Sequence, residues 1–123
     1  MPRNIIKTLD KNFSDMKAGD RMYIASPEVV SAHIKTIKYG QTLTMKQFRR
    51  ELALTVGADQ CCPVTTGIFL RMAIEEVYPL FGIDESPLPF WRVVDETHPV
   101  LKKLGIPASD IAEIREKESI LHK

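Results

Sequence analysis

The stretch PVTTGIFLRMAIEEV, residues 63–77, carries a long helical pattern. Pro63 is suited to the first position of a helix, where the missing N–H leaves no hydrogen bond unmade. Apolar side chains recur at helical spacing in two adjoining rows, Val64-Ile68-Met72 and Phe69-Ala73-Val77. Only the row Gly67-Arg71-Glu75 is suited to solvent. The pattern therefore predicts a helix that is buried over most of its circumference.

Shorter helical patterns lie on both sides of this stretch. Residues 4–16 have apolar side chains at helical spacing, and Ser26 and Thr44 are suited to cap two further helices. A helical turn is expected around residues 100–104 and a last helix from about Ser109 to Ile120, whereas the proline-rich residues 78–89 predict an irregular loop. The expected fold class is all-α, with an N-terminal helical extension over residues 1–22 and one domain over residues 23–123.

Length and composition restrict the class of protein. The 123 residues fit one domain, and the formal net charge of +1 means that only a local basic patch could attract nucleic acid. No apolar run approaches the ~20 residues that span a bilayer, and the N-terminus has no signal-peptide core, so we expect a cytoplasmic chain without membrane contact. Scattered histidines and the absence of a phosphate-binding loop or dinucleotide motif predict no metal and no cofactor.

Two segments taken together resemble a known family. Residues 37–48 read IKYGQTLTMKQF, and residues 89–94 read PFWRVV. They are similar to the helix-turn-helix start and to the active-site motif Pro-Cys-His-Arg-Val-Val of the O6-alkylguanine-DNA alkyltransferases. The second segment also resembles the Pro-Trp-His-Arg-Val-Val form of the non-enzymatic alkyltransferase-like proteins, and the closing REKESI, residues 115–120, resembles the family's final Glu-Gly. The resemblance covers about residues 24–120 and implies a winged-helix-like DNA-binding domain.

This chain departs from the family at the residues that carry its chemistry. Phe90 aligns with the methyl-accepting cysteine, and a phenyl ring has no lone pair that could attack an alkyl carbon. Trp91 aligns with the histidine that takes the proton, but the indole N–H only donates. Met45 aligns with the tyrosine that helps to rotate the base out, and the arginine that fills the resulting gap would lie near Thr65 or Thr66. We therefore expect no enzymatic activity.

The resemblance nevertheless implies a surface for double-stranded DNA. In the family the second helix of the helix-turn-helix meets the minor groove through small residues, which here are Thr65, Thr66 and Gly67, although Gly67 could instead serve tight helix packing. Phosphate contacts would come from outward-facing cations, for which a solvated helix face is the simpler explanation. These cations are Lys46, Arg49, Arg50 and Arg71. A remnant base pocket would comprise Pro89, Phe90, Trp91, Arg92 and Glu118, of which Arg92 and Glu118 could equally form a structural ion pair.

Three classes of function follow from these observations. The first is a non-enzymatic DNA-binding protein that recognises alkylated or distorted DNA. The second is a protein-interaction module that kept the fold and lost DNA binding, which the near-neutral charge favours. The third is a thiol enzyme: Cys61 and Cys62 precede a helix start, where the helix dipole can lower a thiol pKa, although buried structural cysteines are the commoner case.

Overall fold

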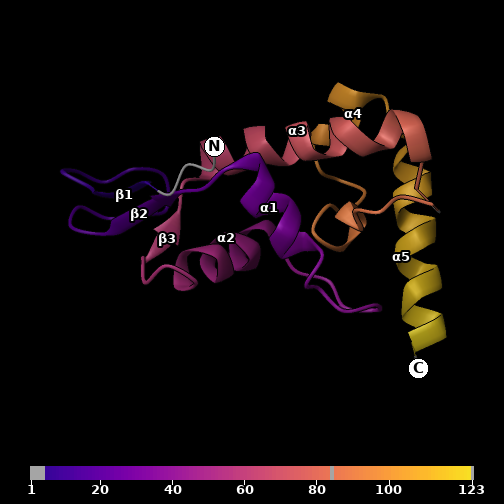
Figure 1. The fold of residues 1–123 in the computed structure, drawn as a ribbon, viewed down its shortest axis with the longest axis horizontal. Coiled ribbons are helices and arrows are strands. Elements are labelled where there is room, and N and C mark those ends of the chain that lie inside the picture. Colours follow the sequence, from indigo (N-terminus) through magenta and orange to yellow (C-terminus); the bar gives the residue numbers. More distant parts are fainter. Residues whose placement is uncertain (1–4, 84, 123) are drawn as a thin grey trace.

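The computed structural model describes residues 5–83 and 85–122, with side chains up to residue 119. A β-hairpin projects at one end of the molecule, the longer helices form the middle, and the last helix stands at the other end (Figure 1). In chain order the elements are β1 (Ile5–Thr8), β2 (Arg21–Ile24), α1 (Pro27–Ile34), α2 (Met45–Leu54), β3 (Gln60–Cys61), α3 (Pro63–Phe81), the 3-10 turn η1 (Phe90–Arg92), α4 (Val100–Leu104) and α5 (Ala108–His122).

The small sheet corrects the expectation of an all-α fold. β1 pairs antiparallel with β2, and β2 pairs parallel with β3, so the molecule is a mixed α/β structure. The predicted N-terminal helix over residues 4–16 is therefore wrong from residue 5 onward, and the expected boundary after residue 22 falls inside β2. The helical spacing was misleading because Ile5 and Ile6 are 45% and 36% exposed and meet no core that would select a helix.

The predicted caps of the first two helices are confirmed. The Ser26 hydroxyl accepts a hydrogen bond from the amide of Val29 at 3.2 Å at the start of α1. The Thr44 hydroxyl accepts from the amide of Gln47 at 3.1 Å, and the Gln47 side chain accepts from the amide of Thr44 at 2.8 Å. This reciprocal pair is a capping box, which sets the start of α2 from local sequence alone.

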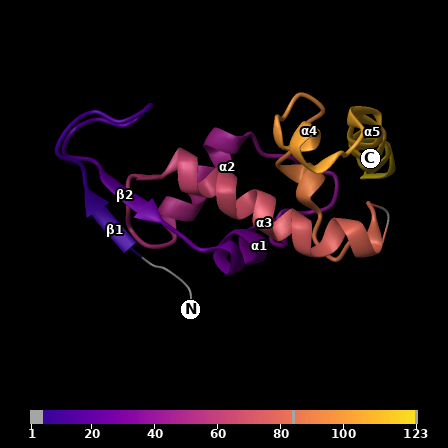
Figure 2. The ribbon, with the colours of Figure 1, turned by 90° about the horizontal axis from the view of Figure 1, so that it is seen from above.

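The long helix α3 begins at Pro63 as expected and runs along the molecule from the sheet towards α5 (Figure 2). It is less buried than predicted, because the row Val64-Ile68-Met72 is 57%, 45% and 43% exposed. The helix also continues through Pro79 to Phe81, where an irregular loop was expected from residue 78.

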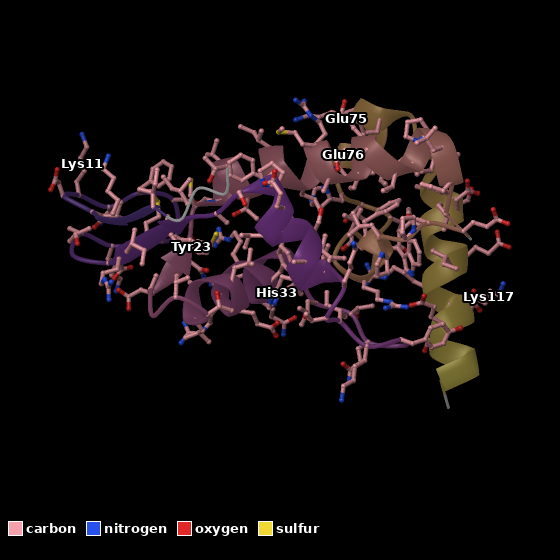
Figure 3. The ribbon with its side chains drawn as sticks, in the orientation of Figure 1. Lys11, Tyr23, His33, Glu75, Glu76 and Lys117 are labelled. Atoms are coloured by element: carbon pink, nitrogen blue, oxygen red, sulfur yellow. The ribbon has the colours of Figure 1, made fainter. Side chains whose placement is uncertain are left out.

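One hydrophobic core joins the helices, and a small cluster lies under the hairpin. The small cluster comprises Met16, Met22 and Cys62. The main core contains the largest fully buried side chains of the described residues, including Tyr23, Phe48, Leu70, Ile74 and Phe90. Figure 3 shows that His33 lies between α1 and α2, where its ring packs edge-on against Phe48 with 5.4 Å between centroids.

Candidate functional site

A buried carboxylate organises the residues around η1. Glu118 of α5 is 5% exposed, and its Oε2 accepts a hydrogen bond from the Trp91 indole N–H at 2.8 Å. Arg92 donates through Nε to Oε1 and through Nη2 to Oε2, both at 3.0 Å. Burial alone would raise the pKa of Glu118, but the hydrogen bonds from Arg92 and Trp91 outweigh it and hold this pKa below its ordinary value.

Arg92 also ties η1 to the loop that precedes α2. Its Nη1 donates to the carbonyl of Ile37 at 2.8 Å, and its own carbonyl accepts from the amide of Leu43 at 2.8 Å. The guanidinium lies 5.5 Å from the centroid of the Tyr39 ring, within range of a cation–π interaction. The two segments that together carry the family resemblance, residues 37–48 and 89–94, are therefore in direct contact.

The predicted base-pocket residues come together, but as a packed cluster. Phe90 is fully buried, and its ring meets those of Tyr78 and Trp91 edge-on at centroid distances of 6.3 and 5.5 Å. Trp91 is 5% exposed, and Pro89 is half-buried. The rings of Phe90 and Trp91 therefore fill the predicted remnant pocket themselves.

An open hollow of about 320 Å³ adjoins this cluster at Val93. Its wall combines apolar side chains with hydrogen-bonding groups of both kinds. The lining residues are Thr42, Leu43, Thr44, Met45, Gln47, Val93, Asp95, Thr97, His98, Pro99 and Arg115. A hollow of this size and mixed polarity suits a planar heterocycle that carries donors and acceptors on its edge.

Asp95, His98 and Arg115 are the ionisable residues that line this hollow. Burial lowers the pKa of His98, against a smaller opposing effect of Asp95. His98 Nδ1 accepts a hydrogen bond from the amide of Val100 at 3.1 Å, so the neutral ring carries its proton on Nε2. Asp95 accepts from the hydroxyl and the amide of Thr97 at 2.7 and 2.9 Å, and the hydroxyl bond is the main reason why the pKa of Asp95 lies below its ordinary value.

The predicted phosphate-contacting cations are not equivalent. Lys46 and Arg50 are exposed on α2 as expected. Arg49 was expected to face outward, but it is 6% exposed and its Nη2 pairs with Asp15 Oδ2 at 2.6 Å. The half-buried Arg71 lies beside Glu75, with 3.5 Å between Nε and Oε1. The solvent-face assignment of Arg49 is wrong because the hairpin loop, distant in sequence, covers that side of α2.

The three small residues at the start of α3 also differ in environment. Thr66 is 1% exposed, and its hydroxyl donates to the carbonyl of Cys62 at 2.6 Å, so it faces the interior. Thr65 and Gly67 are half-buried. A Cβ added at Gly67 would find no heavy atom within 4 Å. Packing inside the described part of this chain therefore does not require a glycine at this position.

The two cysteines lie in the interior of the described structure. Both are free and buried, and Cys61 Sγ lies 3.2 Å from the Thr66 hydroxyl oxygen. Burial raises the pKa of Cys61, against a smaller lowering by that hydroxyl. The lowering that a helix dipole could bring is therefore not found at Cys61, whose thiol stays protonated at neutral pH, and the commoner case of buried cysteines is confirmed for both residues.

Comparisons with known proteins found no relative of this chain. No protein-family model, no curated protein and no solved structure matches this chain. Across the described residues, no helix is both long and apolar enough to cross a membrane.

Sequence patterns did not predict Asp15, Asp95, Thr97 and His98 as site residues. None of them belongs to a motif, and each reaches the site only through the fold.

Proposed function

We propose that this chain is a non-enzymatic DNA-binding protein of the alkyltransferase-like kind, which meets duplex DNA with the first turns of α3. Gly67 carries the proposal. A glycine within a helix destabilises a fold by about 0.5–1 kcal/mol relative to alanine, and no neighbour in the described chain needs the space that it leaves. Such a position suits the close approach of a backbone from outside the molecule, as in the minor groove of DNA.

Cations on both sides of Gly67 support this proposal. Lys46 of α2 lines an open hollow of about 340 Å³ together with Pro63 and Gly67. On the other side, Lys103 of α4 lines a second hollow, of about 260 Å³, together with Gly67 and Ile68. If the start of α3 lay in a groove of DNA, the lysines on its two sides could each contact one of the two phosphate backbones that border the groove.

The hollow beside Val93 provides a place for an extruded base. Its His98 Nε2–H, Asp95 carboxylate and Arg115 offer both donors and acceptors to a base edge, while Met45 offers an apolar contact. Because flipping requires least energy for a damaged or mismatched base, such a pocket favours distorted DNA without base-sequence reading by α3.

A blocking substitution tests the proposal. Gly67→Leu should reduce affinity for duplex DNA at least tenfold by preventing close approach, while the fold stays at least as stable as before because leucine favours the helix and the added Cβ meets open space. Ser119→Leu puts the same side chain on an exposed position of α5 and serves as the matched control. Fluorescence anisotropy with a labelled duplex and thermal unfolding give the two readouts. Equal affinity of the two variants would contradict DNA docking at α3.

One observation favours the alternative function, a protein-interaction module. The exposed row Val64-Ile68-Met72 gives α3 an apolar stripe, and pairing of Arg49 with Asp15 and of Arg71 with Glu75 interrupts the basic surface beside it. Exposed apolar stripes are typical of protein docking surfaces. Absence of any binding to duplex DNA at low salt, in the unaltered chain, would favour this module over the DNA-binding protein.

We assign the protein to the cytoplasm as part of the same proposal. Cys61 and Cys62 are both free thiols, and they are adjacent in the chain. Reduced cysteines are the rule in the cytoplasm, where thiol buffers keep disulfides from persisting.

A further inference from the structure

Arg49 is a buried cation with unused hydrogen-bonding capacity. The residue is 94% buried, yet its Nε is out of contact with water and has no hydrogen-bond partner among the described residues. Its single ion pair joins Nη2 to Asp15. A buried unpaired donor is unfavourable, and more so on a charged group, so a native structure that retains one calls for an explanation.

The space beside Arg49 is open and positively charged. Arg49 and Lys46 line the 340 Å³ hollow together with Pro63, the first residue of α3. In the described structure the first turn of α3 has no acidic residue and no side-chain cap, so the positive end of its dipole is uncompensated there. The nearest anion is the carboxylate of Asp15, which also lines the hollow.

Asp15 reaches this hollow from a loop that is held mainly by its own contacts. The loop between β1 and β2 is closed by backbone hydrogen bonds between Leu9 and residues 19–20 and by the bridge between Phe13 and Met16. Ser14, directly before Asp15, has φ = 57°, the only positive φ of a non-glycine residue in the described chain. A non-glycine residue in this region is strained, and such strain persists where surrounding contacts impose it. The Asp15 side chain remains 35% exposed, so it can leave Arg49 by rotating into water.

We propose that Arg49 is a phosphate-binding residue for the DNA backbone, and that the Asp15 carboxylate occupies its place until DNA arrives. This inference rests on the proposed function and adds to it a site and its regulation. A backbone phosphate displaces Asp15 from Nη2, and its second oxygen reaches the unpaired Nε, since an arginine fork pairs with phosphate through two parallel hydrogen bonds. The displaced carboxylate returns to water, and Lys46 and the start of α3 face the same phosphate.

Removal of the competing carboxylate should strengthen DNA binding. Asp15→Asn should raise affinity for a short labelled duplex roughly tenfold, the effect of one charged hydrogen bond that no longer has to be exchanged. The slope of log K against log salt should stay as it is in the unaltered chain, because Arg49 neutralises the same phosphate in both proteins, whereas Arg49→Met should make it shallower by about 0.9. Asp10→Asn is the matched control: it removes the same charge from the same loop, and Asp10 makes no hydrogen bond or ion pair within the described residues.

The gain should depend on Arg49. In an Arg49→Met background, Asp15→Asn should raise the affinity for duplex DNA by no more than Asp10→Asn does. A gain in affinity that persists without Arg49, or equal gains for Asp15→Asn and Asp10→Asn, would overturn the inference while DNA binding itself stands. If no variant binds DNA at low salt, the proposed function fails and the inference with it.

A measurement on the unaltered chain makes the test independent of how well Asp15→Asn folds. In a ¹H–¹⁵N NMR titration with duplex DNA, the Nε–H signal of Arg49 should shift as it gains a partner. Saturation of the protein with DNA and an unmoved Arg49 signal would rule out the phosphate contact.

Discussion

At the scale of single residues, Glu118 shows how one buried group joins separate parts of the chain. Both of its oxygens accept hydrogen bonds, from Trp91 and Arg92, and Arg92 continues the network to the carbonyl of Ile37. A buried carboxylate is tolerable only with such partners, since desolvation of an unpaired charge is strongly unfavourable. The contact therefore stabilises the docking of α5 against η1 only while Glu118 is ionised.

The stability of the protein should accordingly depend on pH through Glu118. Its folded pKa lies below the ordinary value of 4.5, so the folded state binds fewer protons than the unfolded state. This stabilisation is complete above about pH 4.5 and is lost as the pH falls through the folded pKa. Urea unfolding between pH 7 and acid should show a fall in unfolding free energy that is smaller in Glu118→Gln. Glu116→Gln, an exposed neighbour on α5, should retain the full fall. Equal pH profiles of the two variants would contradict this role.

Phe90 should act on stability and not on DNA binding. Its ring is fully buried between Tyr78 and Trp91, so Phe90→Ala empties a core site and should lower the unfolding free energy by roughly 3–5 kcal/mol. Phe81→Ala, at a ring that is 46% exposed, should lower it far less. Chemical denaturation gives both values, and titration with lesion-containing DNA gives the affinities. Intact stability together with a lesion-specific loss of affinity would show that Phe90 contacts a base.

At the scale of elements, the hairpin and α3 differ most from the rest of the molecule. All four residues of β1 are exposed, and β1 pairs only with β2 among the described strands. Lys11 at the hairpin tip and Lys117 on α5 lie at opposite ends of the molecule (Figure 3). The hairpin is anchored to the body through the pairing of β2 with β3, through Met16 and through the ion pair of Asp15 with Arg49.

This arrangement predicts a gradient of local stability. Backbone amides of β1 should exchange with solvent at a free energy well below that of global unfolding, because opening them exposes few buried apolar contacts. Amides around Leu70 and Ile74 in α3 should exchange only on global unfolding, since those side chains are fully buried. Native-state hydrogen exchange measured by NMR checks both, and similar protection of the two elements would show that the hairpin folds as part of the core.

At the scale of the whole molecule, the candidate surface exists only where several elements meet. The hollows around Gly67 and Val93 combine residues of α2, α3 and α4 with the loop after η1, and His98 lines three of them. Gly67 lies between two lysines that are 57 residues apart in sequence, Lys46 and Lys103. The overall charge of +1 thus conceals a local arrangement that composition cannot reveal.

The sequence by itself determined the features whose cause is local. Ser26 and Thr44 begin α1 and α2 because a side-chain oxygen caps the next amides, and Pro63 begins α3 because its ring already has helical φ. The family resemblance singles out residues 37–48 and 89–94 as a pair, and the fold puts them in contact.

Only the tertiary structure decided the features whose cause is distant in the chain. Residues 21–24 form a strand because they pair with β3, some forty residues away, and residues 5–8 pair with them in turn. Such pairing can override the helical spacing of apolar residues where no core packs against that helix face. Arg49 is buried because the loop that carries Asp15 packs over it. The side chains of Val64, Ile68 and Met72 remain exposed because no other element of the described chain covers that face of α3. Periodicity shows which side chains share a face of a helix, but the neighbours that cover this face come from the rest of the chain.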